Sequence, residues 1–192
     1  ACWKTYLGRP EEDVIRESAM RQLANGLSGV NLSEDALAVE EATLATMRRV
    51  GASEIRILNV QSNLACTYHA VGRFEDALRL QRDTYSAHLK LFGEENFETL
   101  TEANNYASLL KRLRRFGEVK LLLQKNIPLA RSALGESHKL TLLMRKIYAV
   151  ALCRDDSATL GDVRKAVTTL EETERTMRRV LGGAHPLTMD VE

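Results

Sequence analysis

A glycine that recurs at a fixed interval most constrains how this chain of 192 residues can fold. Gly51, Gly93 and Gly135 follow one another at intervals of 42 residues, and Gly182 comes 47 residues after the third. Other residue types keep the same register: Asn63 and Asn105; Ala65, Ala107 and Ala149; Leu58, Leu100 and Leu142; Thr99, Thr141 and Thr188. Intervals of about 20 to 50 residues are typical of repeat arrays. The sequence therefore predicts one array of similar units.

The glycine columns set the expected boundaries of these units. The predicted units are 10–50, which is degenerate, then 51–92, 93–134 and 135–181, and finally 182–192, which begins a further unit or forms a capping segment. The five extra residues of the fourth unit fall near 154–162, where polar and turn-forming residues predict an insertion in a loop.

Within one unit the apolar residues have helical spacing. Leu58, Ala65 and Tyr68 lie on one face of a predicted helix that ends at Gly72. A second apolar stripe then runs from Phe74 to Leu91 and predicts a second helix. No part of the chain requires a strand, so each unit is predicted to be a helical hairpin.

Small residues explain how the two helices of a hairpin pack. Ala65 and Ala77 remove side-chain bulk where the helix axes approach, and we expect Tyr68 and Phe74 to fill the space beside them. One unit cannot bury enough surface alone, so the hairpins stack on their neighbours. The predicted fold class is all-α: tandem antiparallel helical hairpins stacked as a right-handed α-solenoid with a concave and a convex face.

Composition excludes several classes of function. Lysine and arginine total 27 against 26 acidic residues, so bulk charge favours neither nucleic acid nor a membrane surface as partner. No apolar run approaches the ~18 residues of a membrane span. Three cysteines without a C-x-x-C pair indicate a reducing compartment. We expect an intracellular, cytoplasmic protein; an organellar location stays open because the chain begins at Ala1 and not at a methionine.

The repeat resembles a known family through three kinds of segment: Asn63-Leu64-Ala65-Cys66-Thr67-Tyr68, Gly72-Arg73-Phe74-Glu75-Asp76-Ala77-Leu78, and the unit end Leu134-Gly135-Glu136-Ser137-His138. These resemble tetratricopeptide repeats (TPRs) in the longer form of kinesin light chains, and the resemblance covers nearly the whole chain. The fourth unit departs by its insertion and by Ile147 in place of asparagine. The resemblance implies a protein-interaction scaffold whose first helices line a concave groove.

Carried over to this chain, the resemblance implies three sets of groove residues: Asn59, Ser62, Asn63, Cys66 and His69; Thr101, Asn104, Asn105, Ser108, Lys111 and Arg112; and Lys146, Ile147, Val150 and Arg154. A side-chain amide both donates and accepts hydrogen bonds, so Asn63 and Asn105 suit the backbone of an extended peptide. The lysines and arginines favour acidic side chains. We therefore expect a protein or peptide partner of acidic character.

Several residues have a structural interpretation beside the functional one. The groove asparagines are alternatively bonded within the scaffold. The basic run Lys111–Arg115 is interpreted as a solvated turn instead of a nucleic-acid patch. His138 and His185 share a column and are interpreted as residues near helix starts, not as catalysts. Cys66 and Cys153 are expected to be buried or groove-lining.

Three functions compete at this point. The first is a non-catalytic scaffold that holds a partner segment in its groove, and the second is a structural subunit of a larger assembly that uses convex and edge surfaces. The third, an enzyme, is not expected, because nucleotide-binding, hydrolase and zinc-protease motifs are missing from the sequence. No metal or cofactor is expected either, since Asp155-Asp156 lacks the pattern of a calcium loop.

Overall fold

The structure is a computed structural model that describes residues 10, 13–29 and 32–182. The chain divides into two compact units, an N-terminal unit up to Ala87 and a C-terminal unit from His88 onward. Residues 183–192 of the predicted final segment 182–192, with His185 and Thr188, lie outside the described residues, as does Cys2.

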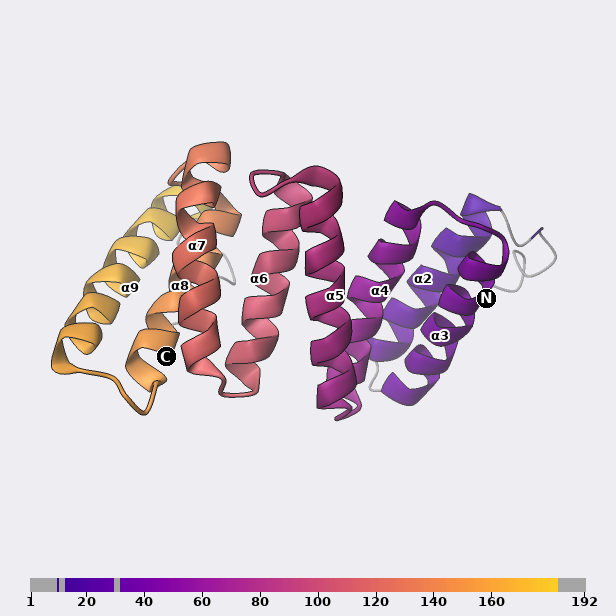
Figure 1. The fold of residues 1–192 in the computed structure, drawn as a ribbon, viewed down its shortest axis with the longest axis horizontal. Coiled ribbons are helices and arrows are strands. Elements are labelled where there is room, and N and C mark those ends of the chain that lie inside the picture. The colour runs from indigo at the N-terminus through magenta and orange to yellow at the C-terminus, as the bar shows by residue number, and fades with distance from the viewer. Residues whose placement is uncertain (1–9, 11–12, 30–31, 183–192) are drawn as a thin grey trace. The chain divides into compact units, whose positions relative to one another are not determined.

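Eight helices, and no strands, make up the regular structure of the described ranges, and within each compact unit successive helices run antiparallel (Figure 1). The helices are α2 (Val14–Gly29), α3 (Ser33–Arg49), α4 (Glu54–Ala70), α5 (Phe74–Phe92), α6 (Phe97–Arg112), α7 (Phe116–Leu134), α8 (Lys139–Arg154) and α9 (Leu160–Leu181). The all-α class with tandem helical hairpins is thus confirmed.

The core of the N-terminal unit lies between α3 and α4. Leu37, Leu44 and Met47 of α3 are buried against Val60 and Leu64 of α4. Ala65 and Ala77 are also fully buried, as expected for small residues at the point where two helices approach.

Phe74 corrects one prediction for this unit. The Phe74 side chain is 44% exposed and does not fill the space beside the alanines. It is the first residue of α5, and its ring lies 5.3 Å from that of His69, outside the core. Tyr68 behaves as expected, because it packs against the α3–α4 core while its hydroxyl donates to Glu41 over 2.8 Å.

A threonine column accounts for part of the repeat register in the C-terminal unit. Thr99 and Thr141 are fully buried near the starts of α6 and α8. The Thr99 hydroxyl donates to the His88 carbonyl over 3.2 Å, and the Thr141 hydroxyl donates to the Ala130 carbonyl over 3.3 Å. In both cases the acceptor lies eleven residues earlier. At both positions the threonine therefore links the first helix of a hairpin to the preceding helix.

The residues before α6 and α8 are also equivalent. The Asn96 side chain accepts from the Glu98 backbone N–H over 2.8 Å, and His138 Nδ1 accepts from the Leu140 N–H over 3.2 Å. Both are N-caps, which satisfy donors that the helix itself leaves free. His138 therefore lies at a helix start, as the sequence predicted.

The glycines that end the repeats adopt backbone angles that other residues avoid. Gly135 has φ 96° and ψ 157°, and Gly182 has φ 86° and ψ 153°. This region of φ/ψ space is essentially restricted to glycine. The recurring glycine thus ends one hairpin and turns the chain toward the next.

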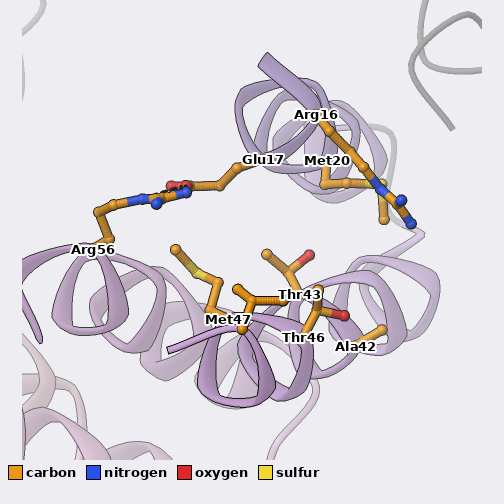
Figure 2. A pocket seen from close by; sticks show the side chains of 9 residues that line it. Arg16, Glu17, Met20, Ala42, Thr43, Thr46, Met47 and Arg56 are labelled. Carbon is orange, nitrogen blue, oxygen red and sulfur yellow. Dashed lines mark hydrogen bonds and ion pairs between the residues drawn. The ribbon is translucent and has the colours of Figure 1, made fainter. Parts of the chain in front are cut away.

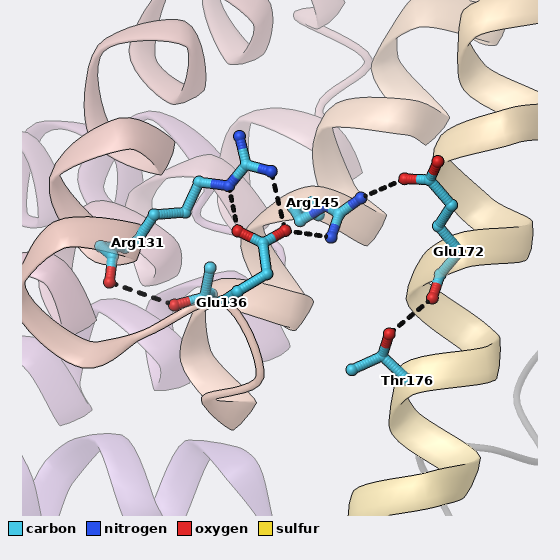
Figure 3. A network of polar contacts seen from close by, with 7 residues as sticks. Arg131, Glu136, Arg145, Glu172 and Thr176 are labelled. Carbon is cyan, nitrogen blue, oxygen red and sulfur yellow. Dashed lines mark hydrogen bonds and ion pairs between the residues drawn. The ribbon is translucent and has the colours of Figure 1, made fainter.

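A polar network joins α7, α8 and α9 in the C-terminal unit (Figure 3). Buried Arg145 pairs with Glu136 over 2.6 Å and with Glu172 of α9 over 2.8 Å. Arg131 of α7 completes the network through Glu136, with 2.7 Å from its Nη2 to Oε1. The Arg131 hydrogen bond lowers the pKa of Glu136. Because the buried guanidinium needs its carboxylate partners, these contacts fix the position of α9 on α8.

Candidate functional site

Helix α6 carries a continuous polar face. The sequence placed six groove candidates on it, and none of them is buried: Thr101, Asn104, Asn105, Ser108, Lys111 and Arg112. The other faces of α6 pack against the protein, since Leu100, Ala103, Ala107 and Leu110 are all buried. Spacings of three and four residues bring the six side chains to one side of the helix. We call this surface the α6 face.

One atom of the α6 face has an unmet bonding capacity. The side-chain carbonyl oxygen Oδ1 of Asn104 is shielded from solvent and has no hydrogen-bond partner among the described residues. A buried acceptor without a partner costs stability. The Asn104 side chain, which is half-buried, is therefore a polar residue whose amide the fold does not fully satisfy.

Helix α8 packs directly against α6 and continues this surface. Lys146 and Val150 are half-buried and Arg154 is exposed, at positions equivalent to Asn104, Ser108 and Arg112. Ile147, predicted to line the groove, is only 6% exposed. Its apolar side chain belongs to the core of the unit, so the asparagine row has no third member on α8.

Helix α4 carries the corresponding residues of the N-terminal unit. Asn59 and Cys66 are exposed, while Ser62, Asn63 and His69 are half-buried. Their spacing places all five on one face, which we call the α4 face, away from buried Leu58 and Leu64. Cys66 and Cys153 are both exposed and neither is part of a disulfide in the described ranges, which excludes the buried alternative for them.

The turn between α6 and α7 contains the basic run of the sequence. Arg114 has φ 60°, the left-handed conformation, and its N–H donates to the Lys111 carbonyl while the Arg115 N–H donates to the Leu110 carbonyl. This hydrogen-bond pair is a Schellman motif, in which the left-handed residue is usually glycine. The basic run is thus a solvated turn, and Arg115 pairs with Glu118.

A pocket of about 330 Å³ lies between this turn and the segment after α8. Arg114 and Arg115 line it from the α6–α7 turn, and Asp155 and Asp156 line it from the predicted loop insertion. The Lys120 ammonium lies 2.8 Å from Asp155 Oδ2. That contact and the hydrogen bonds from Ser157 hold the pKa of Asp155 far below its ordinary value.

A second cavity, of about 110 Å³, lies among α2, α3 and α4 in the N-terminal unit (Figure 2). Met20 and Met47 face it, and Glu17 of α2 pairs with Arg56 of α4 beside it, with 2.8 Å from Arg56 Nε to Glu17 Oε2. Sequence reasoning missed this cavity. The first repeat is degenerate, so no repeated column marks Met20 or Glu17.

Known proteins share the repeat and the fold of this chain. Residues 57–98 match the tetratricopeptide repeat family. A kinesin-light-chain protein of Podosopora anserina with nearly identical TPR-like repeats has a similar crystal structure, with a TM-score of 0.72, 19% identity, and coverage of 93% of this chain and 82% of that one. The structure of BtubC from P. vanneervenii gives a TM-score of 0.63 at 16% identity, covering 96% of this chain and 89% of that one.

Curated relatives match about two thirds of this chain. Clustered mitochondria protein homologs of Emericella nidulans and Aspergillus fumigatus are each 24% identical over 128 residues, which is 66% of this chain. The chain spans only 10% of the length of these relatives.

Fold and matches together define a helical-repeat protein of the TPR-like α-solenoid class. Residues 57–98 match a tetratricopeptide repeat, and the fold of the chain is similar to that of the TPR-like repeats in the kinesin-light-chain structures.

Two features, a membrane-spanning helix and a metal-binding group, are absent from the described residues. None of the helices in the described ranges is long and apolar enough to cross a membrane. Within the same part of the chain, His, Cys, Asp and Glu side chains form no group of three or more that is able to hold a metal ion.

Proposed function

We propose that this protein is a non-catalytic interaction scaffold that binds an extended, acidic segment of a protein partner along α6 and α8. The observation that carries the proposal is the α6 face, where six polar side chains share the unburied side of one helix and Asn104 Oδ1 has no partner among the described residues.

Backbone recognition is the first half of the proposed binding mode. An extended peptide offers N–H and C=O groups at regular spacing, whatever its sequence. Asn104 and Asn105 are adjacent amides on the same face and supply both donors and acceptors. We assign them the role of holding the peptide backbone.

Recognition of charge is the second half of the proposed binding mode. Arg112 and Arg154 are exposed at equivalent ends of α6 and α8, and neither has an ion pair among the described residues. Lys111 and Lys146 add two further cations to the surface. Carboxylates of the partner would form charge-assisted hydrogen bonds there. The α4 face, with Asn59 and Asn63, would be a separate polar contact patch in the N-terminal unit.

Selection from a random peptide display library tests the proposal. We expect the wild-type protein to enrich peptides that are rich in Asp and Glu, and the variant N104A/N105A to lose that enrichment. N25A is the matched control, because Asn25 is an exposed asparagine on α2. Equal enrichment by the wild-type protein and N104A/N105A would refute the α6 face as the binding surface.

A charge-reversal pair separates the two halves of the mechanism. R112E/R154E should shift the selection away from acidic peptides, whereas R175E, a reversal at an exposed position of α9, should leave it unchanged. An unchanged acidic preference in R112E/R154E would contradict the electrostatic part of the proposal.

The structural-subunit alternative has its own supporting observation. Helix α9 exposes Leu160, Val163 and Val167 at helical spacing, and an apolar stripe of this kind suits a contact with another subunit. Light scattering and mass spectrometry of the native protein distinguish the two. A stoichiometric set of companions favours the subunit, and a lone monomer favours the peptide-binding scaffold.

We place this function in the cytoplasm, with cytoplasmic proteins near mitochondria as the first partners to test, because the relatives are named for clustered mitochondria. Fluorescence microscopy of the tagged full-length protein tests this location. A signal confined to the interior of an organelle would contradict it.

A further inference from the structure

Arg114 combines three features that the fold alone does not require. Its backbone is left-handed, with φ 60°. Its side chain is exposed and lines the pocket between the α6–α7 turn and the segment after α8. Its guanidinium, 6.0 Å from the centre of the Phe116 ring, has no ion pair among the described residues.

The equivalent turn of the N-terminal unit shows what the backbone itself needs. There Gly72 has φ 81°, and the N–H groups of Gly72 and Arg73 donate to the carbonyls of His69 and Tyr68. The hydrogen-bond pattern is that of the Arg114 turn. Glycine is therefore sufficient for this turn, and an arginine there carries steric strain. Strain of this kind is often found at functional sites.

Most charged residues at the pocket are already paired, and Arg114 is not paired within the described ranges. Arg115 pairs with Glu118, and Lys120 pairs with Asp155, which also accepts two hydrogen bonds from Ser157. Only Asp156, among the charged residues that line the pocket beside Arg114, likewise has no ion pair within the described part of the chain. The pocket thus offers one unpaired cation and one unpaired anion.

The surroundings of the pocket are basic. This turn, the first residues of α7, the segment after α8 and the C-terminal ends of α6 and α8 hold six cations and three carboxylates: Lys111, Arg112, Arg114, Arg115, Lys120 and Arg154, and Glu118, Asp155 and Asp156. A nucleic-acid backbone carries a phosphate at every nucleotide and has no cation for Asp156, the carboxylate of the pocket without an ion pair in the described part of the chain. A protein segment that carries an acidic side chain and a nearby cation is complementary to the charges of Arg114 and Asp156.

We propose that Arg114 anchors an acidic side chain of the protein segment that binds along α6. This inference rests on the proposed function. It adds where the acidic residue of the partner lies, which is the end of the bound segment at the α6–α7 turn. Arg114 follows the C-terminal end of α6, so the acidic residue of the partner lies beyond Lys111 and Arg112, in the pocket. The uncharged stretch of the partner lies along Asn104 and Asn105.

The variant R114G separates an anchor from a structural residue. It removes the guanidinium and also relieves the strained backbone, so we expect its melting temperature to rise while its affinity falls. The probe is a fluorescein-labelled peptide, a stretch of glycines that ends in a run of glutamates, and affinity is measured by fluorescence anisotropy with the full chain. We expect R114G to weaken binding by about three- to tenfold, and R114K to retain part of the affinity.

Further variants and probes make each outcome decisive. R164A, at an exposed position of α9, should bind as the wild-type protein does. If R114G binds the peptide with unchanged affinity while N104A/N105A weakens it, Arg114 is not the anchor and the proposed function stands. If neither variant changes binding, or the wild-type protein does not bind the peptide, both proposals fail. Tighter binding of duplex DNA than of the peptide, lost in R114G, would replace the protein partner with nucleic acid.

Discussion

The α4–α5 and α6–α7 turns share a hydrogen-bond pattern but differ in the side chains that they place around it. Gly72 forms the first turn and Arg114 the second, both with positive φ. The aromatic residue two positions later is exposed in the first turn, as Phe74, and buried in the second, as Phe116 at 7% exposure. The difference shows that the repeat register fixes the backbone of a turn, whereas individual residues decide how much of it is core and how much is available for binding.

The helices that precede these turns differ in charge. Helix α4 ends in His69 and Ala70, and α6 ends at the same positions in Lys111 and Arg112. Both faces carry the shared asparagine, Asn63 or Asn105. The common amide suits recognition of a backbone, while the cations, found only on α6, suit recognition of an acidic partner.

Truncation of the two aromatic residues should show the largest difference between the turns. F116A removes a buried ring and should destabilise the protein by about 3–5 kcal/mol. F74A removes a largely exposed ring and should cost less than about 1 kcal/mol. Urea denaturation followed by circular dichroism measures both. Equal losses would contradict the burial difference.

A substitution at a unit end should have the next largest effect. G135A forces a side chain into a region of φ/ψ space that only glycine populates, and it should cost about 1–3 kcal/mol. G117A is the control, because Gly117 does not have a positive φ and the nearest atom to an added Cβ is 3.8 Å away. Thermal denaturation compares the two variants. A loss in G117A as large as that in G135A would remove backbone strain as the explanation.

Exchange of the two turn residues should give smaller changes of opposite sign. R114G should stabilise the protein by about 1 kcal/mol, because glycine adopts positive φ without steric cost. G72R should destabilise it by a similar amount. Melting temperatures check both signs, and destabilisation by R114G would mean that the Arg114 side chain contributes more to the fold than its strain costs.

A buried carboxyl in the N-terminal unit should give the smallest effect, and one that depends on pH. Glu40 is 6% exposed, and burial raises its pKa, although the Thr67 hydrogen bond partly offsets this. Because the folded protein holds this proton more tightly than the unfolded chain, its stabilising contribution falls as pH rises from the ordinary glutamate pKa through the raised value. E40Q should remove this dependence and raise stability at neutral pH by up to about 1 kcal/mol.

Urea denaturation of E40Q and of the wild-type protein between pH 4 and pH 8 measures the effect of Glu40. E41Q is the matched control, because Glu41 is an exposed neighbour on the same helix. Parallel pH profiles for E40Q and the wild-type protein would contradict the role of Glu40.

Periodicity was sufficient to predict the helical hairpins, and the bounds of α5, Phe74–Phe92, match the apolar stripe from Phe74 to Leu91 that predicted it. It failed where equivalent positions have different surroundings. Phe74 shares a column with Phe116 but starts its helix outside the core, and Ile147 shares a column with Asn105 but is buried. The left-handed Arg114 and the cavity beside Met20 and Met47 depend on spatial neighbours that one sequence does not reveal.

Chemical-shift mapping by NMR tests the proposed binding surface most directly. The isotope-labelled full chain is titrated with the peptide of glycines that ends in glutamates. We expect the largest shifts at Asn104, Asn105 and the α6–α7 turn, with smaller shifts on α8 at Lys146 and Arg154. Shifts confined to α7 and α9, with the α6 face unchanged, would contradict the α6 face as the binding surface.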